Sequence, residues 1–176
     1  MKHSQAISYW RRFIIVVVSG CFFMIAASLR VNGQEMPPRP ISVTVNLSQN
    51  LSFGAFYHYN TGGTVIIYPD GSRSSTGDIV LLNLGYSFST GLYDVVANSG
   101  TLVSILNGPD VLLTGSNGGS LTLHIGASDP INPFIVTSTP PSATQVRIGG
   151  TLIVGNPLAN PPGNYSGTFS VTFVQE

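Results

Sequence analysis

The chain has 176 residues, of which 43% are hydrophobic and only 8% are charged, with seven basic and seven acidic side chains. From Glu35 onward there is no lysine, and seven acids stand against three arginines, a net charge of minus four. Such a chain cannot build the basic surface that neutralises nucleic-acid phosphates or acidic lipid headgroups, so both kinds of binding are excluded.

Residues 1–33 have the pattern of an export signal. Positive charges precede an apolar stretch over 13–27, and small residues follow up to Gly33. This order predicts a signal peptide cleaved near Gly33 and a protein that is secreted, periplasmic or on the cell surface. Two alternatives keep it at a membrane. One is an uncleaved anchor, because the apolar run approaches the length of a spanning helix; the other is a lipid on Cys21, in a sequence that resembles a lipoprotein box.

Residues 34–40 are expected to form a stiff, proline-rich leader, because proline fixes the backbone torsion φ. Residues 41–176 are then long enough for one domain. Cys21 is the only cysteine, so the domain after the leader has no disulfide and depends on burial of its core.

Within 41–176, short β-rich runs are separated by glycine, proline, asparagine and aspartate, and no stretch has a convincing helical period. This pattern predicts an all-β fold: an antiparallel β-sandwich of the immunoglobulin-like or fimbrial-subunit-like type. The strands are expected over 41–47, 51–58, 64–68, 78–82, 86–89, 92–97, 101–106, 111–114, 120–125, 134–138, 144–148, 151–154 and 165–174.

Two of these strand predictions concern how the chain folds back and how it ends. Asn98-Ser99-Gly100 separates 92–97 from 101–106 and predicts a hairpin between them. The last strand, 165–174, places Phe169, Val171 and Phe173 on one face. We expect these three side chains to point into the core, because residues two apart share a face of a strand.

The sequence carries no catalytic motif, so we expect no enzyme, no cofactor and no metal. His58 and His124 are the only histidines after the predicted signal and lie far apart. We expect His58 to be a half-exposed strand residue and His124 to face outward. Asp70 and Asp110 follow or precede turn residues and are expected to cap turns.

Two segments are candidates for binding. Phe56, Tyr57 and Tyr59 belong to the densest aromatic cluster, and exposed aromatic rings can stack on sugars or contact a partner. The alternative is that they form core and rim. In the segment 41–47, Ile41, Val43, Val45 and Leu47 alternate with polar residues. This segment could be donated to a neighbouring subunit, or it could pair within its own sheet.

Several segments resemble one family of secreted bacterial proteins. They are Leu51-Ser-Phe53-Gly54, Tyr68-Pro-Asp-Gly71-Ser-Arg73-Ser, and the run from Gly149-Gly150-Thr-Leu to Pro162-Gly163-Asn-Tyr165-Ser-Gly167-Thr-Phe169-Ser-Val171-Thr. These motifs resemble domain of unknown function 4402, which is similar in turn to spore coat U and fimbrial subunit domains. The resemblance covers roughly residues 41–174. It implies a β-sandwich and carries no activity with it.

The expected function is therefore a non-enzymatic structural or adhesive subunit, secreted or on the cell surface, that assembles by strand addition with copies of itself or with other surface subunits. The alternative is an extracellular module that binds a carbohydrate or a protein through exposed aromatic side chains.

Overall fold

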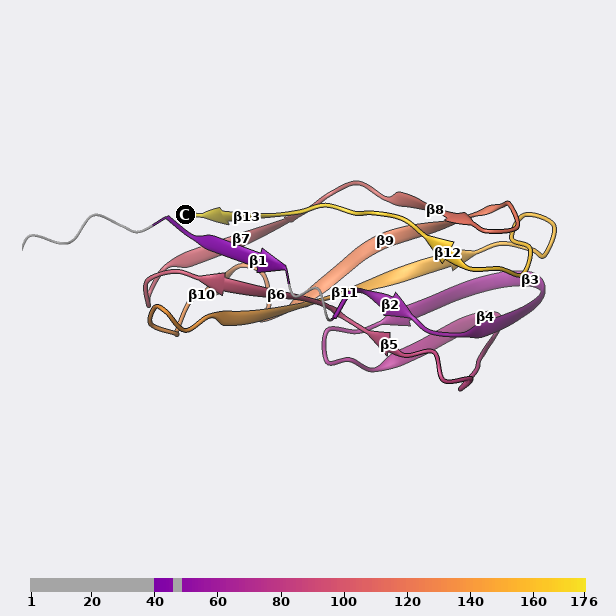
Figure 1. Ribbon diagram of the computed structural model, residues 1–176, viewed down its shortest axis with the longest axis horizontal. Coiled ribbons are helices and arrows are strands. Elements are labelled where there is room, and N and C mark those ends of the chain that lie inside the picture. Colours follow the sequence, from indigo (N-terminus) through magenta and orange to yellow (C-terminus); the bar gives the residue numbers. More distant parts are fainter. Residues whose placement is uncertain (1–39, 46–48) are drawn as a thin grey trace, which may run out of the picture. The chain divides into compact units, whose positions relative to one another are not determined.

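The computed structural model describes residues 40–45 and 49–176, which belong to a compact unit over Pro38–Glu176. In this part of the chain there are thirteen strands and no helix (Figure 1). All strand ladders are antiparallel, which confirms the predicted all-β sandwich. No helix within these residues is long and apolar enough to cross a membrane. The predicted signal, its cleavage point and Cys21 lie outside the described residues.

Strand β11 (Thr144–Val154) is the centre of the largest sheet, which has eight strands. One edge of β11 pairs with β9 (Ser120–Asp129). The other edge pairs first with β6 (Gly91–Val96) and then with β3 (Phe56–Ile67). The register against β9 shifts between Ile148 and Gly150, where the neighbour on the opposite edge changes from β6 to β3. The two strands predicted over 144–148 and 151–154 are therefore one continuous strand.

Four further strands complete this sheet. Beyond β6 lies β1 (Ser42–Val45), and beyond β3 lies β4 (Arg73–Leu81). On the side of β9, the sheet continues with β8 (Val111–Gly115) and ends with β12 (Tyr165–Ser166). Strands β1, β4 and β12 are thus edge strands, each hydrogen-bonded to one neighbour among the described residues.

Two smaller sheets pack against the large one. The first has the order β10 (Phe134–Ile135), β7 (Leu102–Asn107) and β13 (Val171–Gln175). The second contains only β2 (Ser52–Phe53) and β5 (Phe88–Ser89). Side chains from all three sheets form one hydrophobic cluster, as expected for a sandwich with a single core.

The predicted hairpin at Asn98–Gly100 is wrong. A backbone hydrogen bond from Thr101 N to Asn98 O, 3.1 Å long, does close a turn there. The strands on either side, β6 and β7, belong to different sheets. Val95 and Val103 are both fully buried, so the turn carries the chain across the core from one layer to the other.

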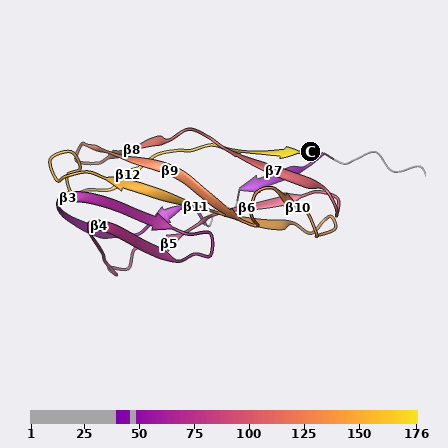
Figure 2. The same ribbon diagram turned by 180° about the vertical axis from the view of Figure 1, so that it is seen from behind.

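The predicted strands 51–58 and 165–174 are each interrupted. Gly54 has a φ of 67°, which ends β2 and lets β3 begin at Phe56. The C-terminal segment changes sheets: β12 pairs with β8, whereas β13 pairs with β7 (Figures 1 and 2). Phe169, Val171 and Phe173 pack against the core as expected, although each stays partly exposed.

Candidate functional site

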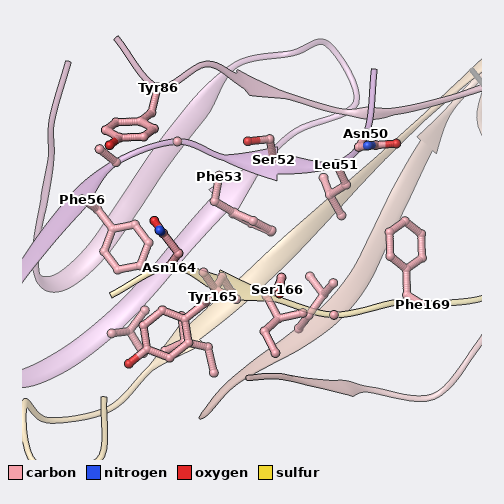
Figure 3. A pocket seen from close by; sticks show the side chains of 18 of the residues that line it. Asn50, Leu51, Ser52, Phe53, Phe56, Tyr86, Asn164, Tyr165, Ser166 and Phe169 are labelled. Carbon is pink, nitrogen blue, oxygen red and sulfur yellow. The ribbon is translucent and has the colours of Figure 1, made fainter. Parts of the chain in front are cut away.

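A groove of about 1090 Å³ lies between the segment 49–56, which contains β2, and the segment 160–169, which contains β12. Its floor is apolar and comes from the large sheet: Leu113 of β8, Leu121 and Leu123 of β9, and Leu152 and Val154 of β11. Figure 3 shows the two segments on opposite sides of the groove, with Leu51, Phe53 and Phe56 directed into the space between them. The groove is therefore an opening onto the core itself.

The hydrophobic side chains in the floor of the groove are more buried than those in its walls. The leucines of β9 and β11 are at most 3% exposed. In contrast, Leu51, Phe56, Tyr165 and Phe169 line the walls and are only partly buried. A core residue in a closed sandwich is normally covered from both layers. The hydrophobic core is thus incomplete along this line.

The strands beside the groove also have unpaired backbone edges. Among the described residues, β2 pairs only with β5, and β12 pairs only with β8. Strand β13, which continues the second wall, pairs only with β7. An edge strand presents N–H and C=O groups that can bind another extended segment. In the described part of the chain, the groove therefore combines an apolar floor with short side strands that each form a ladder along one edge only.

The groove has no formal charge. No Asp, Glu, Lys or Arg is found among the described residues that line it, and its polar groups are amides, hydroxyls and the His58 imidazole. Burying a charge in such a place would be costly without a partner. The arrangement suits a neutral, extended occupant with alternating apolar side chains.

Arg73 of β4 holds the first wall in place. Its Nη1 donates hydrogen bonds to Phe53 O at 2.9 Å and to Ala55 O at 3.3 Å, and its Nη2 donates to Leu82 O at 3.2 Å. The guanidinium carbon lies 4.4 Å from the centroid of the Phe88 ring. Burial lowers the pKa of Arg73 from its ordinary value, but a guanidinium stays protonated in proteins.

Asn160 holds the second wall in place. It is only 4% exposed; its Oδ1 accepts from Gly155 N, and its Nδ2 donates to Ser120 O at the start of β9. The backbone oxygen of Asn160 accepts from His58 Nε2 at 3.1 Å, so this nitrogen carries the proton. Next along the wall, the Tyr165 hydroxyl donates to Pro161 O at 2.6 Å, and burial raises the pKa of Tyr165.

A protein-family model, that of domain of unknown function 4402 (DUF4402), matches residues 42–174. The chain belongs to this family. A search of curated proteins gave no match, and a search of solved structures gave none either. The further likeness of DUF4402 to spore coat U and fimbrial subunits is untested by these comparisons and stays a prediction.

In this DUF4402 domain, the motifs that carry the resemblance meet at the groove. Leu51-Ser-Phe53-Gly54 forms part of the first wall, and the run from Pro162 to Phe169 forms part of the second. Arg73, from the motif 68–74, braces the first wall, and Leu152, from the motif that begins at Gly149, lies in the floor. Three motifs that are distant in sequence thus converge on one feature.

The aromatic cluster is divided between two faces of the DUF4402 domain. Phe56 is partly buried and lines the groove. Tyr57 and Tyr59 are 51% and 53% exposed, and their rings meet edge to face with centroids 4.9 Å apart. Because alternate residues of a strand face opposite ways, the three predicted binding residues do not form one site.

The candidate donor strand pairs within its own sheet in this structure. Ser42 to Val45 form a four-residue ladder with β6, from Ser42 opposite Val96 to Val45 opposite Tyr93. Ile41 packs against the core, and Val43 is 38% exposed. Leu47 lies outside the described residues.

The histidines and aspartates behave mostly as expected. His58 is half-buried, and His124 is exposed. Asp70 caps a turn by accepting from Ser72 N at 2.8 Å and from Ser72 Oγ at 2.6 Å. Asp110, immediately before β8, differs: its carboxylate lies 2.7 Å from Nδ1 of His124 on β9, and no backbone amide among the described residues donates a hydrogen bond to it. Within the described part of the chain, no group of three or more His, Cys, Asp or Glu could hold a metal ion.

Sequence reasoning missed the two residues that brace the groove. The sequence indicates Arg73 only as part of the motif 68–74, and nothing in it marks Asn160. Arg73 had one available signal: it is one of three arginines in a stretch without lysine. Asn160 had none, because its partners are 5 and 40 residues away in sequence.

Proposed function

We propose that this protein is a non-enzymatic structural or adhesive subunit, secreted or on the cell surface, which assembles by strand addition. In this proposal the groove of one copy receives an extended segment of another copy. The observation that carries the proposal is the incomplete core: partly buried hydrophobic walls and unpaired strand edges flank an uncharged apolar floor. Main-chain hydrogen bonds would give affinity, and alternating side chains would give specificity.

The segment 41–47 is the donor that we favour. Its sequence is Ile-Ser-Val-Thr-Val-Asn-Leu, with an aliphatic residue at every second position and no charge or proline. These properties match a groove without charged side chains. In the present structure this segment is held by a short edge ladder on β6, and it would have to leave that ladder to be donated.

The energetics of this exchange favour assembly if the groove buries the donor well. Each aliphatic side chain that moves from water into the core contributes about 1.5–3 kcal/mol. Loss of the β1–β6 ladder and of rotational freedom opposes this gain. Because the groove and the donor are different surfaces, the contact is head-to-tail, and repeated contacts give open filaments unless the rotation closes a ring.

A second candidate function rests on a different surface. Tyr57 and Tyr59 of strand β3 present two exposed rings at an interplanar angle of 87°. Such rings can stack on the apolar face of a sugar. A carbohydrate-binding module is therefore the alternative, and it does not use the groove.

Light scattering on size-fractionated protein tests the proposal. We expect oligomers from the chain beginning at Gln34, and we expect Val43→Asp with Val45→Asp to abolish them, because two charges would enter an uncharged groove. Thr44→Asp is the matched control, since it adds a charge on the polar face of the same segment. A wild-type protein that is strictly monomeric at all concentrations would contradict the proposal.

A further inference from the structure

Neither wall of the groove is held mainly by a strand ladder. Strand β2 contributes two residue pairs with β5, and β12 contributes two with β8. Ladders this short stabilise little by themselves. The side chains of Arg73 and Asn160 add hydrogen bonds from the walls to the long strands of the large sheet, beside backbone bonds such as the one from Leu92 N to Gln49 O.

We infer that Arg73 and Asn160 are positioning residues that keep the two walls of the groove apart, so that the donor strand enters a preformed site. This inference rests on the proposed function of the groove. Without these two side chains, the two walls would move toward each other over the buried apolar floor and narrow the groove. The donor would then have to reopen the groove before binding.

Arg73 donates its hydrogen bonds to backbone carbonyls, so it fixes the position of the chain at these points. Its three acceptors are carbonyl oxygens at the end of β2, at the start of β3 and after β4. The only ion pair that an arginine makes among the described residues belongs to Arg147, which lies 3.9 Å from Asp129. The planar fork of arginine can reach several carbonyls at once, whereas a lysine ammonium is a single point charge.

The backbone at Gly54 is shaped around Arg73. Gly54 has a φ of 67°, and a Cβ placed on it would lie 2.6 Å from Arg73 Nη1. Any other residue at this position would be strained and would displace the guanidinium. The bend that ends β2 and the arginine that holds it are therefore one unit.

Asn160 plays the same part on the opposite side. Its side chain is buried and bridges two backbone groups, one in its own loop and one at the start of β9. Its backbone oxygen is tied to His58 of β3. The loop that leads into β12 is thus fixed to β9 and to β3, which lie on opposite edges of β11.

A preformed groove changes the rate of association most. If only a fraction of molecules has an open groove, the apparent affinity falls by that fraction. Loss of a hydrogen bond to a charged group typically costs enough to change a population about tenfold. Once the donor is bound, it holds the walls itself, so dissociation should change little.

The test measures binding of a fluorescent synthetic peptide covering residues 38–48 by stopped flow. The protein begins at Gln34 and so contains the whole compact unit Pro38–Glu176; it carries Val43→Asp to prevent donation between copies. We expect Arg73→Gln and Asn160→Ala each to slow association about tenfold, with Arg73→Lys between Arg73→Gln and wild type. Arg147→Gln is the matched control and should bind like wild type.

The outcomes separate this inference from the proposal beneath it. If the parent protein binds no peptide, the proposed function fails. If the parent binds and the folded Arg73→Lys and Asn160→Ala variants associate at the parent rate, the groove needs no bracing and the inference is overturned. Folding is checked by circular dichroism at the same temperature; should Arg73→Gln not fold, the Arg73→Lys rate decides.

Discussion

Strands β11 and β13 both alternate apolar and polar residues, yet β11 buries the apolar side chains of its core face almost completely and β13 buries them only in part. Val146 and Ile148 of β11 are both 0% exposed. Val171 and Phe173 of β13 pack against the same core but stay partly exposed. β11 has partners along both edges, whereas β13, within residues 40–45 and 49–176, pairs only with β7. The comparison shows that the core is finished on one side and open on the other.

Deletion of residues 165–176 is the change that we expect to destabilise the protein most. It removes β12 and β13, and with them one wall of the groove and an aromatic contact of 5.4 Å between Phe173 and Tyr93. We expect the shortened protein to unfold or aggregate, as measured by thermal denaturation followed by circular dichroism. Cooperative melting near the wild-type temperature would mean that this segment is peripheral.

Truncation of single core side chains to alanine compares the two sides by their contributions to the free energy of unfolding. Ile148→Ala on the closed side should cost about 2–5 kcal/mol in the free energy of unfolding, as expected for a fully buried aliphatic residue. Phe173→Ala on the open side should cost less than the roughly 3–5 kcal/mol typical of a buried phenylalanine. Urea titrations of the monomer measure both. If Phe173→Ala lost as much unfolding free energy as is typical of a buried phenylalanine, the core around β13 would be closed in solution.

The outer face of β3 is a third region for comparison, because its side chains neither belong to the core nor line the groove. Tyr57→Ala with Tyr59→Ala should change the unfolding free energy by no more than about 0.5 kcal/mol per residue and leave oligomers intact. Glycan-array binding measures the alternative function. Loss of glycan binding in this variant with normal assembly would assign the two activities to separate surfaces.

The smallest expected effect is on acid stability. The backbone amide of Thr61, 2.7 Å from Asp78 Oδ2, lowers the pKa of Asp78, and the hydroxyl of Ser72 lowers the pKa of Asp70. A lowered pKa in the folded state stabilises the fold above the ordinary value of 3.8, and this contribution is lost as the pH falls below it.

Asp78→Asn should therefore flatten the decline of the melting temperature between about pH 4 and pH 2. Asp94→Asn serves as the control for removing a negative charge from a strand. If Asp94→Asn flattened the decline as much as Asp78→Asn, the contact between Asp78 and Thr61 would not be the cause.

The sequence predicted the fold class and most strands because alternation and turn residues are local properties. It could not predict the change of sheet between β12 and β13, because an alternating strand suits either layer and its partners decide. The prediction of a hairpin at Asn98–Gly100 was wrong for the same reason. The groove was missed because its floor and walls come from segments between 49 and 169. Arg73 bonds carbonyls up to 20 residues away, so no local pattern reveals its role.

Disulfide trapping between copies tests the central claim most directly. The chain from Gln34 onward has no cysteine, so Val43→Cys in one copy and Ser166→Cys in another give one possible bond between donor and groove. We predict that mild oxidation gives the mixed Val43–Ser166 dimer, identified by mass against the two homodimers, whereas Val43→Cys with Leu112→Cys, at an exposed outer position, gives no mixed dimer. Absence of the Val43–Ser166 dimer, or equal yields with both partners, would contradict strand addition into the groove.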